Sequence, residues 1–172
     1  MPRNSASQTG GTVHSTPSPS SGNELLRVGW REWVALPQFN IRAMKVKVDT
    51  GARTSALHAY SVERVVERGT PRVRFMLHPL RFRTDVEVNG EADVIGERWV
   101  SDSGGHREKR LVIATDIVLG AMRFPIELTI TDRDTMRFRM LLGRNAIRGR
   151  LMVDPSTSYR LGRPQLPRRS RP

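Results

Sequence analysis

A carboxylate stands at the end of an apolar strand and at the start of a tight turn, where residues 48–59 read V-D-T-G-A-R-T-S-A-L-H-A. Asp49 follows the alternating segment A-M-K-V-K-V, and Gly51 lets the chain turn sharply behind it. A carboxylate in such a turn can take a proton from a water molecule as a general base. The segment predicts acid–base chemistry at Asp49, with Thr50, Gly51 and Ala52 shaping the turn.

Acid–base hydrolysis of this kind uses two carboxylates. When they lie about 3 Å apart they cannot both ionise, so one retains a proton that it can donate. The chain has a second tripeptide of the pattern Asp-Ser/Thr-Gly, Asp102-Ser103-Gly104, but it follows R-W-V and precedes G-H-R-E-K-R, so no apolar segment returns to bury its turn. We interpret it as the glycine-rich tip of a β-hairpin. With one convincing copy per chain, a symmetric homodimer would have to bring two Asp49 side chains together.

About ninety residues after the aspartate, the chain reads M-L-L-G-R-N at positions 140–145. Two large apolar residues, ending at Leu142, precede Gly143, where another segment can pass closely. With this pairing of motifs the sequence resembles the retropepsin-like aspartic peptidases, and above all the bacterial group named ATP-dependent zinc proteases. Members of that group share K-V-D-T-G-A-R-T-S-A-L-H-A almost word for word and end with M-L-L-G-R. The resemblance covers roughly residues 25–155.

The resemblance implies a small closed β-barrel of the acid protease type and an endopeptidase whose water is activated by an Asp49/Asp49′ dyad. It implies that Thr50 hydrogen-bonds across the dimer and that a hairpin near residues 100–107, with Ser103, Gly104 and Gly105, closes over the substrate as a flap. A plain surface hairpin is the alternative for that segment. The resemblance also implies an Arg144 paired with an acidic residue just after Asp-Thr-Gly-Ala, but Arg53 and Thr54 stand there in this chain.

The name of the group implies that its members bind zinc and use ATP. His58 is the candidate metal ligand, although a histidine in an apolar run is usually a hydrogen-bonded structural residue. The chain has no H-E-x-x-H, no G-x-x-x-x-G-K-[ST], and four histidines far apart in sequence. We expect no required cofactor and no ATP site. Two alternatives stay open: a metal-dependent hydrolase that uses Asp49 and His58, and a non-catalytic binding or assembly domain with a basic surface. Members of the group often accompany ATP-grasp ligases that add amino acids to proteins or peptides, which hints at such substrates.

The composition limits the class of protein. With 172 residues, of which 37% are hydrophobic, the chain is long enough for one domain with a core but not for two enzyme-sized lobes. The absence of cysteine excludes disulfides, a thiolate nucleophile and cysteine-based zinc sites. No apolar run approaches the ~18 residues of a membrane helix, and the N-terminus does not read as a secretory signal. We expect a soluble, cytoplasmic protein without membrane contact.

The formal net charge of +12 suggests an anionic partner, because Lys and Arg neutralise phosphates. Five of the basic residues lie in the tails, which leaves 12 − 5 = +7 for the middle of the chain, scattered along alternating strands. Such scatter is typical of a solvated strand face, and no zinc-finger, RNA-recognition or helix-turn-helix pattern is present. The expected partners are therefore a second copy of the chain, a peptide or protein substrate, and a transient anionic partner of the basic tails.

Residues 1–23 are rich in Ser, Thr, Gly and Pro, residues 162–172 form a basic tail broken by prolines, and both are expected to be disordered. Between them, residues 24–161 alternate in twos and predict a mainly β domain, either a closed barrel or a sandwich. The expected strands begin near Val28 and include residues 44–48, 71–78, 84–88, 98–100, 110–119, 122–131 and 135–142. Hairpin turns are expected at Asn89-Gly90 and Leu119-Gly120, and short helical turns at residues 61–67 and 145–148.

Overall fold

The computed structural model describes residues 24–80, 83–101, 104–132, 137–164 and 166. The expected disorder of residues 1–23, and of most of the tail, concerns positions outside these ranges. Within the ranges the chain is built mainly from strands, as the period of two predicts. Among the described residues no helix has the length and apolar composition needed to cross a bilayer.

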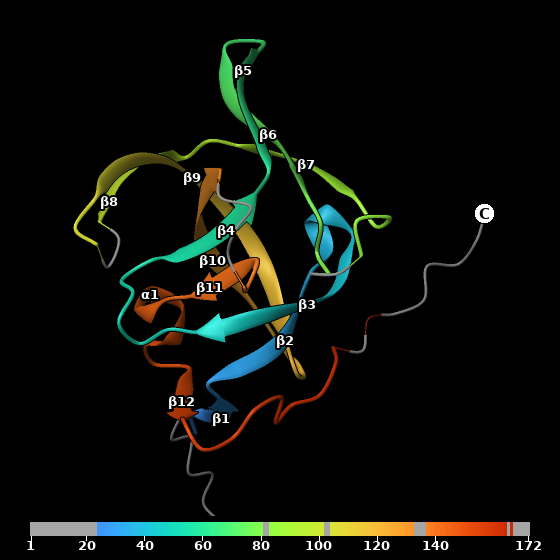
Figure 1. Ribbon diagram of the computed structural model, residues 1–172, viewed down its shortest axis with the longest axis vertical. Coiled ribbons are helices and arrows are strands. Elements are labelled where there is room, and N and C mark those ends of the chain that lie inside the picture. Colours follow the sequence, from blue (N-terminus) through green and yellow to red (C-terminus); the bar gives the residue numbers. More distant parts are fainter. Residues whose placement is uncertain (1–23, 81–82, 102–103, 133–136, 165, 167–172) are drawn as a thin grey trace, which may run out of the picture.

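Six strands close into a barrel (Figure 1). Their order around it is β10 (Met122–Asp132), β4 (Ser55–Ala59), β11 (Met140–Leu142), β3 (Ile41–Val48), β2 (Arg31–Leu36) and β9 (Arg107–Leu119), and antiparallel pairing of β9 with β10 closes the circle. Strand β8 (Gly96–Ser101) extends β9 as the other arm of a hairpin. The prediction of a small closed barrel is confirmed, and the sandwich alternative is wrong.

Two smaller sheets complete the domain. Strands β1 (Leu26–Gly29) and β12 (Leu151–Asp154) pair in parallel, so the two ends of the domain lie side by side. Strands β5 (Ser61–Glu67), β6 (Thr70–Leu77) and β7 (Val88–Asp93) form an antiparallel sheet whose β5–β6 hairpin projects from the barrel (Figure 1). A single 3-10 turn, η1 (Pro37–Phe39), and one short helix, α1 (Arg144–Ile147), are the helical elements of the described chain.

Alternation along β3 places its side chains on two faces. Met44, Val46 and Val48 are buried in the core, whereas Lys45 and Lys47 face outward. Since burying one such apolar side chain stabilises the fold by about 1.5–3 kcal/mol, the inward face fixes the register of β3. The outward face, including the end that carries Asp49, is thereby free to hold charged groups.

Two local predictions are wrong. Residues 61–67 form strand β5 instead of a helical turn, because Arg68 and Gly69 both take positive φ angles, 49° and 81°, and make the tight turn that pairs β5 with β6. Asn89 and Gly90 do not make a hairpin but lie inside β7, a strand that begins only at the end of the predicted 84–88 segment. A Cβ atom at Gly90 would lie 2.2 Å from the ring of Phe75, so this glycine makes room for an aromatic side chain.

Other local predictions are confirmed. Leu119 and Gly120 lie at the β9–β10 connection, where Gly120 has a φ of 58°. The helical turn expected at 145–148 is α1, shifted by one residue. The predicted strand 135–142 is observed only as Met140–Leu142, and residues 133–136 lie outside the described ranges.

Candidate active site

The carboxylate of Asp49 is held at the end of β3 by the turn that follows it. Asp49 Oδ1 accepts hydrogen bonds from the backbone N–H groups of Gly51, at 3.0 Å, and Ala52, at 3.2 Å. A Cβ atom at position 51 would lie 3.2 Å from the same oxygen, which is closer than most Cβ contacts, so glycine at this position avoids crowding the carboxylate. The Asp-Thr-Gly-Ala sequence thus folds back on its own carboxylate and fixes its orientation before any ligand arrives.

A lysine two residues earlier shares this face of β3. Lys47 Nζ lies 3.1 Å from Asp49 Oδ2, the oxygen that the turn leaves open. Partial burial would by itself raise the pKa of Asp49, but the ion pair with Lys47 and the two turn amides outweigh burial. They hold the pKa of Asp49 below its ordinary value of 3.8, so the isolated chain presents an ionised carboxylate near neutral pH.

Strand β11 braces the aspartate turn from behind. It lies between β3 and β4, parallel to the first and antiparallel to the second, and the Leu142 carbonyl accepts the N–H of Asp49 at 2.9 Å. At Gly143, a Cβ atom would lie 2.5 Å from the carbonyl carbon of Thr54. The buried Ser55 hydroxyl accepts the N–H of Gly143 at 3.1 Å. The two segments of the motif pair therefore cross at a distance that only glycine allows.

Arg144 contacts the same turn through backbone carbonyl groups and not through a carboxylate. Its Nη1 donates to the backbone carbonyls of Thr50, at 2.9 Å, and Gly51, at 2.8 Å. The backbone N–H of Arg144 donates to the Ala52 carbonyl at 2.9 Å. A guanidinium that satisfies two carbonyls fixes the turn without the acidic partner that the resemblance implies.

His58 is not part of this arrangement. It lies near the far end of β4 from the Asp49 turn and is 3% exposed, and its backbone N–H donates to the Arg139 carbonyl at 2.8 Å. No group of three or more His, Asp and Glu side chains within the described ranges is placed to hold a metal ion. The described His, Asp and Glu residues therefore do not form a zinc ligand set.

The β8–β9 hairpin lies where the sequence places the flap. Its arms pair from Gly96 with Val112 to Ser101 with Arg107, and Gly105 near the tip has a φ of 82°. Ser103 and the rival carboxylate Asp102 lie outside the described residues, whereas Gly104 and Gly105 lie within them. A hairpin between the two motifs is thus present, and its closure over a substrate stays a prediction.

A model of the family described as RimB-like, "retropepsin-like aspartic endopeptidase RimB", matches residues 27–164. The chain belongs to this family. The resemblance to retropepsin-like aspartic peptidases, inferred from the two motifs, is therefore confirmed. A protein named probable alpha-L-glutamate ligase from Shewanella pealeana is 43% identical over 142 residues, which are 83% of this chain and 31% of the relative. A protein of the same name from Parasynechococcus marenigrum is 43% identical over 78% of this chain and 29% of its own length.

The chain thus spans about a third of the length of these curated relatives. Among solved structures, the protein Lpg0085 of Legionella pneumophila, described as of unknown function, has a TM-score of 0.65 and 27% identity. The match covers 79% of this chain and 98% of that protein. Nearly the whole of that solved chain therefore shares the fold of this domain.

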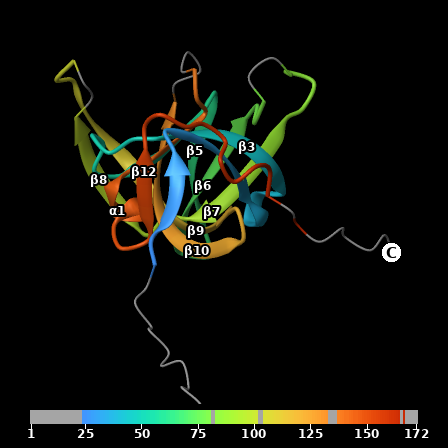
Figure 2. The ribbon, with the colours of Figure 1, turned by 90° about the horizontal axis from the view of Figure 1, so that it is seen from below.

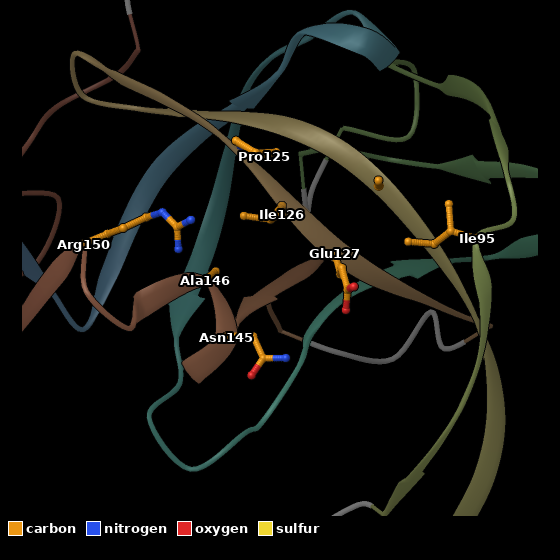
Figure 3. Close-up of a pocket in the computed structure, with 8 residues that line it drawn as sticks. Ile95, Pro125, Ile126, Glu127, Asn145, Ala146 and Arg150 are labelled. Atoms are coloured by element: carbon orange, nitrogen blue, oxygen red, sulfur yellow. The ribbon is translucent and has the colours of Figure 1, made fainter.

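A pocket of about 350 Å³ lies on another part of the barrel (Figure 3). Apolar Pro125, Ile126 and Ala146 form its base, and polar Asn145 and Arg150 stand at its side. Asp49 and its turn do not line it. Helix α1, which starts at Arg144 beside the aspartate turn, contributes Asn145 and Ala146 to the pocket, and Glu127 is the carboxylate in its lining.

Sequence reasoning missed two residues of the site. Lys47 could have been found, because a strand period of two puts positions 47 and 49 on one face and makes their opposite charges neighbours. Ser55 gives no comparable signal, since its hydrogen bond to Gly143 depends on how β11 threads between its neighbours. Both residues act on the turn through backbone or charge contacts.

Proposed function

We propose that the chain is an aspartic-type endopeptidase whose catalytic centre forms when two Asp49 turns meet across a two-fold axis. The observation that carries the proposal is the fixed Asp49 carboxylate, which two turn amides hold and which β11 and Arg144 brace. Such preorganisation positions one polar group for chemistry before substrate binds. Membership in a family described as retropepsin-like aspartic endopeptidase supports the same function.

In the proposed reaction the ionised member of the dyad accepts a proton from a water molecule held between the two carboxylates. The water oxygen attacks the peptide carbonyl carbon, and the protonated member donates toward the developing oxyanion. Bringing a second carboxylate close to Asp49 raises the pKa of one member, which supplies the shared proton. Lys47 would have to give up part of its contact with Asp49 to admit the second carboxylate.

Apolar groups at the ends of the domain support a symmetric dimer. Leu25 is 39% exposed and Met152 in β12 is 49% exposed, both at the two-stranded β1–β12 sheet. A short two-stranded sheet presents unpaired edges that a second copy can cover. A two-fold contact along β1 and β12 would bury these side chains while it completes the active site.

The relatives direct the choice of substrate. Proteins named probable alpha-L-glutamate ligase carry a segment similar to this chain, so a peptide that contains glutamate is the substrate to test first. Lys47, whose ammonium group lies 3.1 Å from the Asp49 carboxylate, suits acidic side chains. The basic character of the whole chain suits them as well.

The proposal is tested with Asp49→Asn, which keeps the size of the side chain but cannot act as a base. Hydrolysis of glutamate-containing peptides, followed by mass spectrometry, should stop while the circular dichroism spectrum and the melting temperature stay close to those of the wild type. Wild-type activity should survive a chelator and the aspartic mechanism should give a bell-shaped pH profile. Full activity in folded Asp49→Asn protein would refute the proposal, and loss in chelator restored by zinc would favour a metal-dependent hydrolase.

A further inference from the structure

Aromatic rings and cations alternate on the outward face of β2 and β3. Arg31 lies 4.5 Å from the ring of Trp30 and 4.9 Å from that of Tyr159. Lys45 lies 5.2 Å from the ring of Trp33 and 5.4 Å from that of Tyr159. The last cation, Arg163, lies 4.5 Å from the ring of Trp33. We call these six residues the ring–cation ladder: Trp30, Arg31, Trp33, Lys45, Tyr159 and Arg163.

The ladder is assembled from distant parts of the chain. Its β2 and β3 members are neighbours because Trp33 pairs with Lys45 in the sheet register. The C-terminal segment runs past β1 in both views (Figures 1 and 2). Its contacts with Lys45 and with the ring of Trp33 place Tyr159 and Arg163 on this face. No sequence pattern predicts the cluster, because its members are far apart in the chain. The basic residues therefore look scattered when only the sequence is considered.

A fully buried carboxylate fixes the C-terminal segment. Glu32 accepts the N–H groups of Gly29, Arg160 and Leu161, at 2.7, 3.0 and 3.3 Å. The N–H of Tyr159 donates to the Arg31 carbonyl at 2.8 Å, and Tyr159 has a φ of 54°. A bulky residue rarely adopts this left-handed conformation, so the surrounding bonds hold the ring in place against backbone strain.

The cations of the ladder differ from those elsewhere on the domain. Many other strand cations pair with carboxylates, as Arg72 and Arg74 do with Glu67 and as Arg123 does with Asp116. Within the described ranges, Arg31, Lys45 and Arg163 have no ion-pair partner and lie over rings instead. Arg107 over Trp99 and Arg150 over Phe124 are similar but isolated pairs, whereas the ladder joins three cations and three rings. Their charge is therefore not neutralised by this part of the chain.

We propose that the ring–cation ladder binds single-stranded nucleic acid, with bases stacked on the rings and phosphates on the cations. Groups that bind single strands combine a positive track with aromatic faces on which successive bases stack. Three half-buried rings, of which Trp33 and Tyr159 have centroids 5.8 Å apart, supply the second of these features. The charge of the ladder is complementary to a phosphate backbone, and its rings favour bases as the occupant.

A polar contact joins the C-terminal segment to β3 beyond the ladder. Arg42 Nη2 donates to the Leu166 carbonyl at 3.1 Å, which places Leu166 beside β3. This binding function does not depend on the proposed peptidase activity.

The test uses the full-length chain with Asp49→Asn, so that nucleic-acid binding is measured apart from hydrolysis. A labelled single-stranded RNA of about 12 nucleotides is titrated, with fluorescence anisotropy and intrinsic tryptophan emission as readouts. Two of the three tryptophans belong to the ladder, so binding should quench the emission. The affinity should fall with salt with a logarithmic slope of about −2, since each phosphate contact contributes about −0.7.

Variants separate rings from charge. Tyr159→Asn removes a ring while the new residue tolerates a positive φ, and Lys45→Gln removes a cation; each should weaken RNA binding by about tenfold. Trp99→Leu and Arg123→Gln are the controls and should change RNA binding by less than about twofold. Trp99 is a ring 60% exposed on β8 with Arg107 over it, outside the ladder, and Arg123 is a cation paired with Asp116. Single-stranded DNA of the same length shows whether the sugar matters, and either preference supports the proposal.

Three results would overturn it. One is RNA affinity that Tyr159→Asn and Lys45→Gln leave unchanged. Another is a loss in the two controls as large as that in the ladder variants. The third is poly-L-glutamate binding as tight as that of RNA, weakened by Lys45→Gln but not by Tyr159→Asn, which would assign the face to an acidic polypeptide.

Discussion

The ion pair between Lys47 and Asp49 is the contact through which the protein sets the charge of its proposed catalytic carboxylate. Replacing Lys47 with Met keeps the length of the side chain and removes the charge. The pKa of Asp49 should then rise, because burial opposes ionisation and Lys47 no longer offsets it. The acid limb of any pH–activity profile that depends on Asp49 should move to higher pH.

The size of the effect follows from the exposure of the pair. The two charged atoms are 3.1 Å apart, but the Lys47 side chain is 43% exposed and that of Asp49 23%. At such exposure solvent screens most of the attraction, and pairs of this kind contribute about 0.2–1 kcal/mol. The difference between wild type and Lys47→Met should shrink in about 1 M salt, where the Debye length is about 3 Å.

Carbon-13 NMR of the Asp49 carboxyl group measures the change directly, and unfolding experiments give a second readout. Because folding lowers the pKa of Asp49, the contribution to stability is complete above the ordinary value of 3.8 and disappears as the pH falls through the folded-state pKa. Wild type should therefore be the more stable protein near neutral pH, and the difference should vanish in acid.

Lys45→Met is the matched control, since Lys45 occupies the same face two residues earlier and contacts rings. A dimer changes the absolute pKa values, so wild type and variants are compared at one protein concentration. An Asp49 titration that Lys47→Met leaves in place, or that Lys45→Met shifts as far, would refute the role of Lys47.

The braces of the turn give three further expectations. Gly143→Ala should destabilise the domain by about 1–3 kcal/mol in urea unfolding, because its Cβ meets the Thr54 backbone, whereas Gly96→Ala, with open space around it, should be tolerated. Ser55→Ala should cost about 1–3 kcal/mol by leaving the buried N–H of Gly143 without its acceptor; unchanged stability would show that this bond is dispensable. Arg144→Gln should reduce kcat for peptide hydrolysis with little change in melting temperature, because an exposed side chain loses two bonds to the turn; Arg148→Gln serves as its control, and equal losses in both would contradict a specific role.

The barrel and the aspartate turn could be predicted because their signals are local. A period of two buries Met44, Val46 and Val48 and leaves Asp49 at the strand end, and glycine marks the turn. Where local signals compete, prediction failed. Residues 61–67 have apolar positions at a helical spacing, yet the turn at Arg68-Gly69 and the partner strand β6 decide the conformation.

Contacts between distant segments could not be predicted. The Asn89-Gly90 pair has the sequence of a hairpin turn. Gly90 is instead needed inside β7, because the ring of Phe75 occupies the space of a side chain at position 90. Glu32 shares a strand face with buried Val34, where a carboxylate is not expected, and it is accommodated because Arg160 and Leu161 of the C-terminal segment donate backbone N–H groups to it. These arrangements arise from packing of the whole chain, as does the ring–cation ladder.

Subunit mixing tests most directly whether two Asp49 turns make one active centre. A fixed amount of wild-type chain is combined with increasing Asp49→Asn chain, allowed to exchange, and assayed for peptide hydrolysis. Our account predicts that activity per wild-type chain falls toward zero as mixed dimers with one carboxylate replace wild-type dimers, and that diluting the wild type also lowers activity per chain. Activity per wild-type chain that stays constant in both series would contradict a dyad shared between two copies.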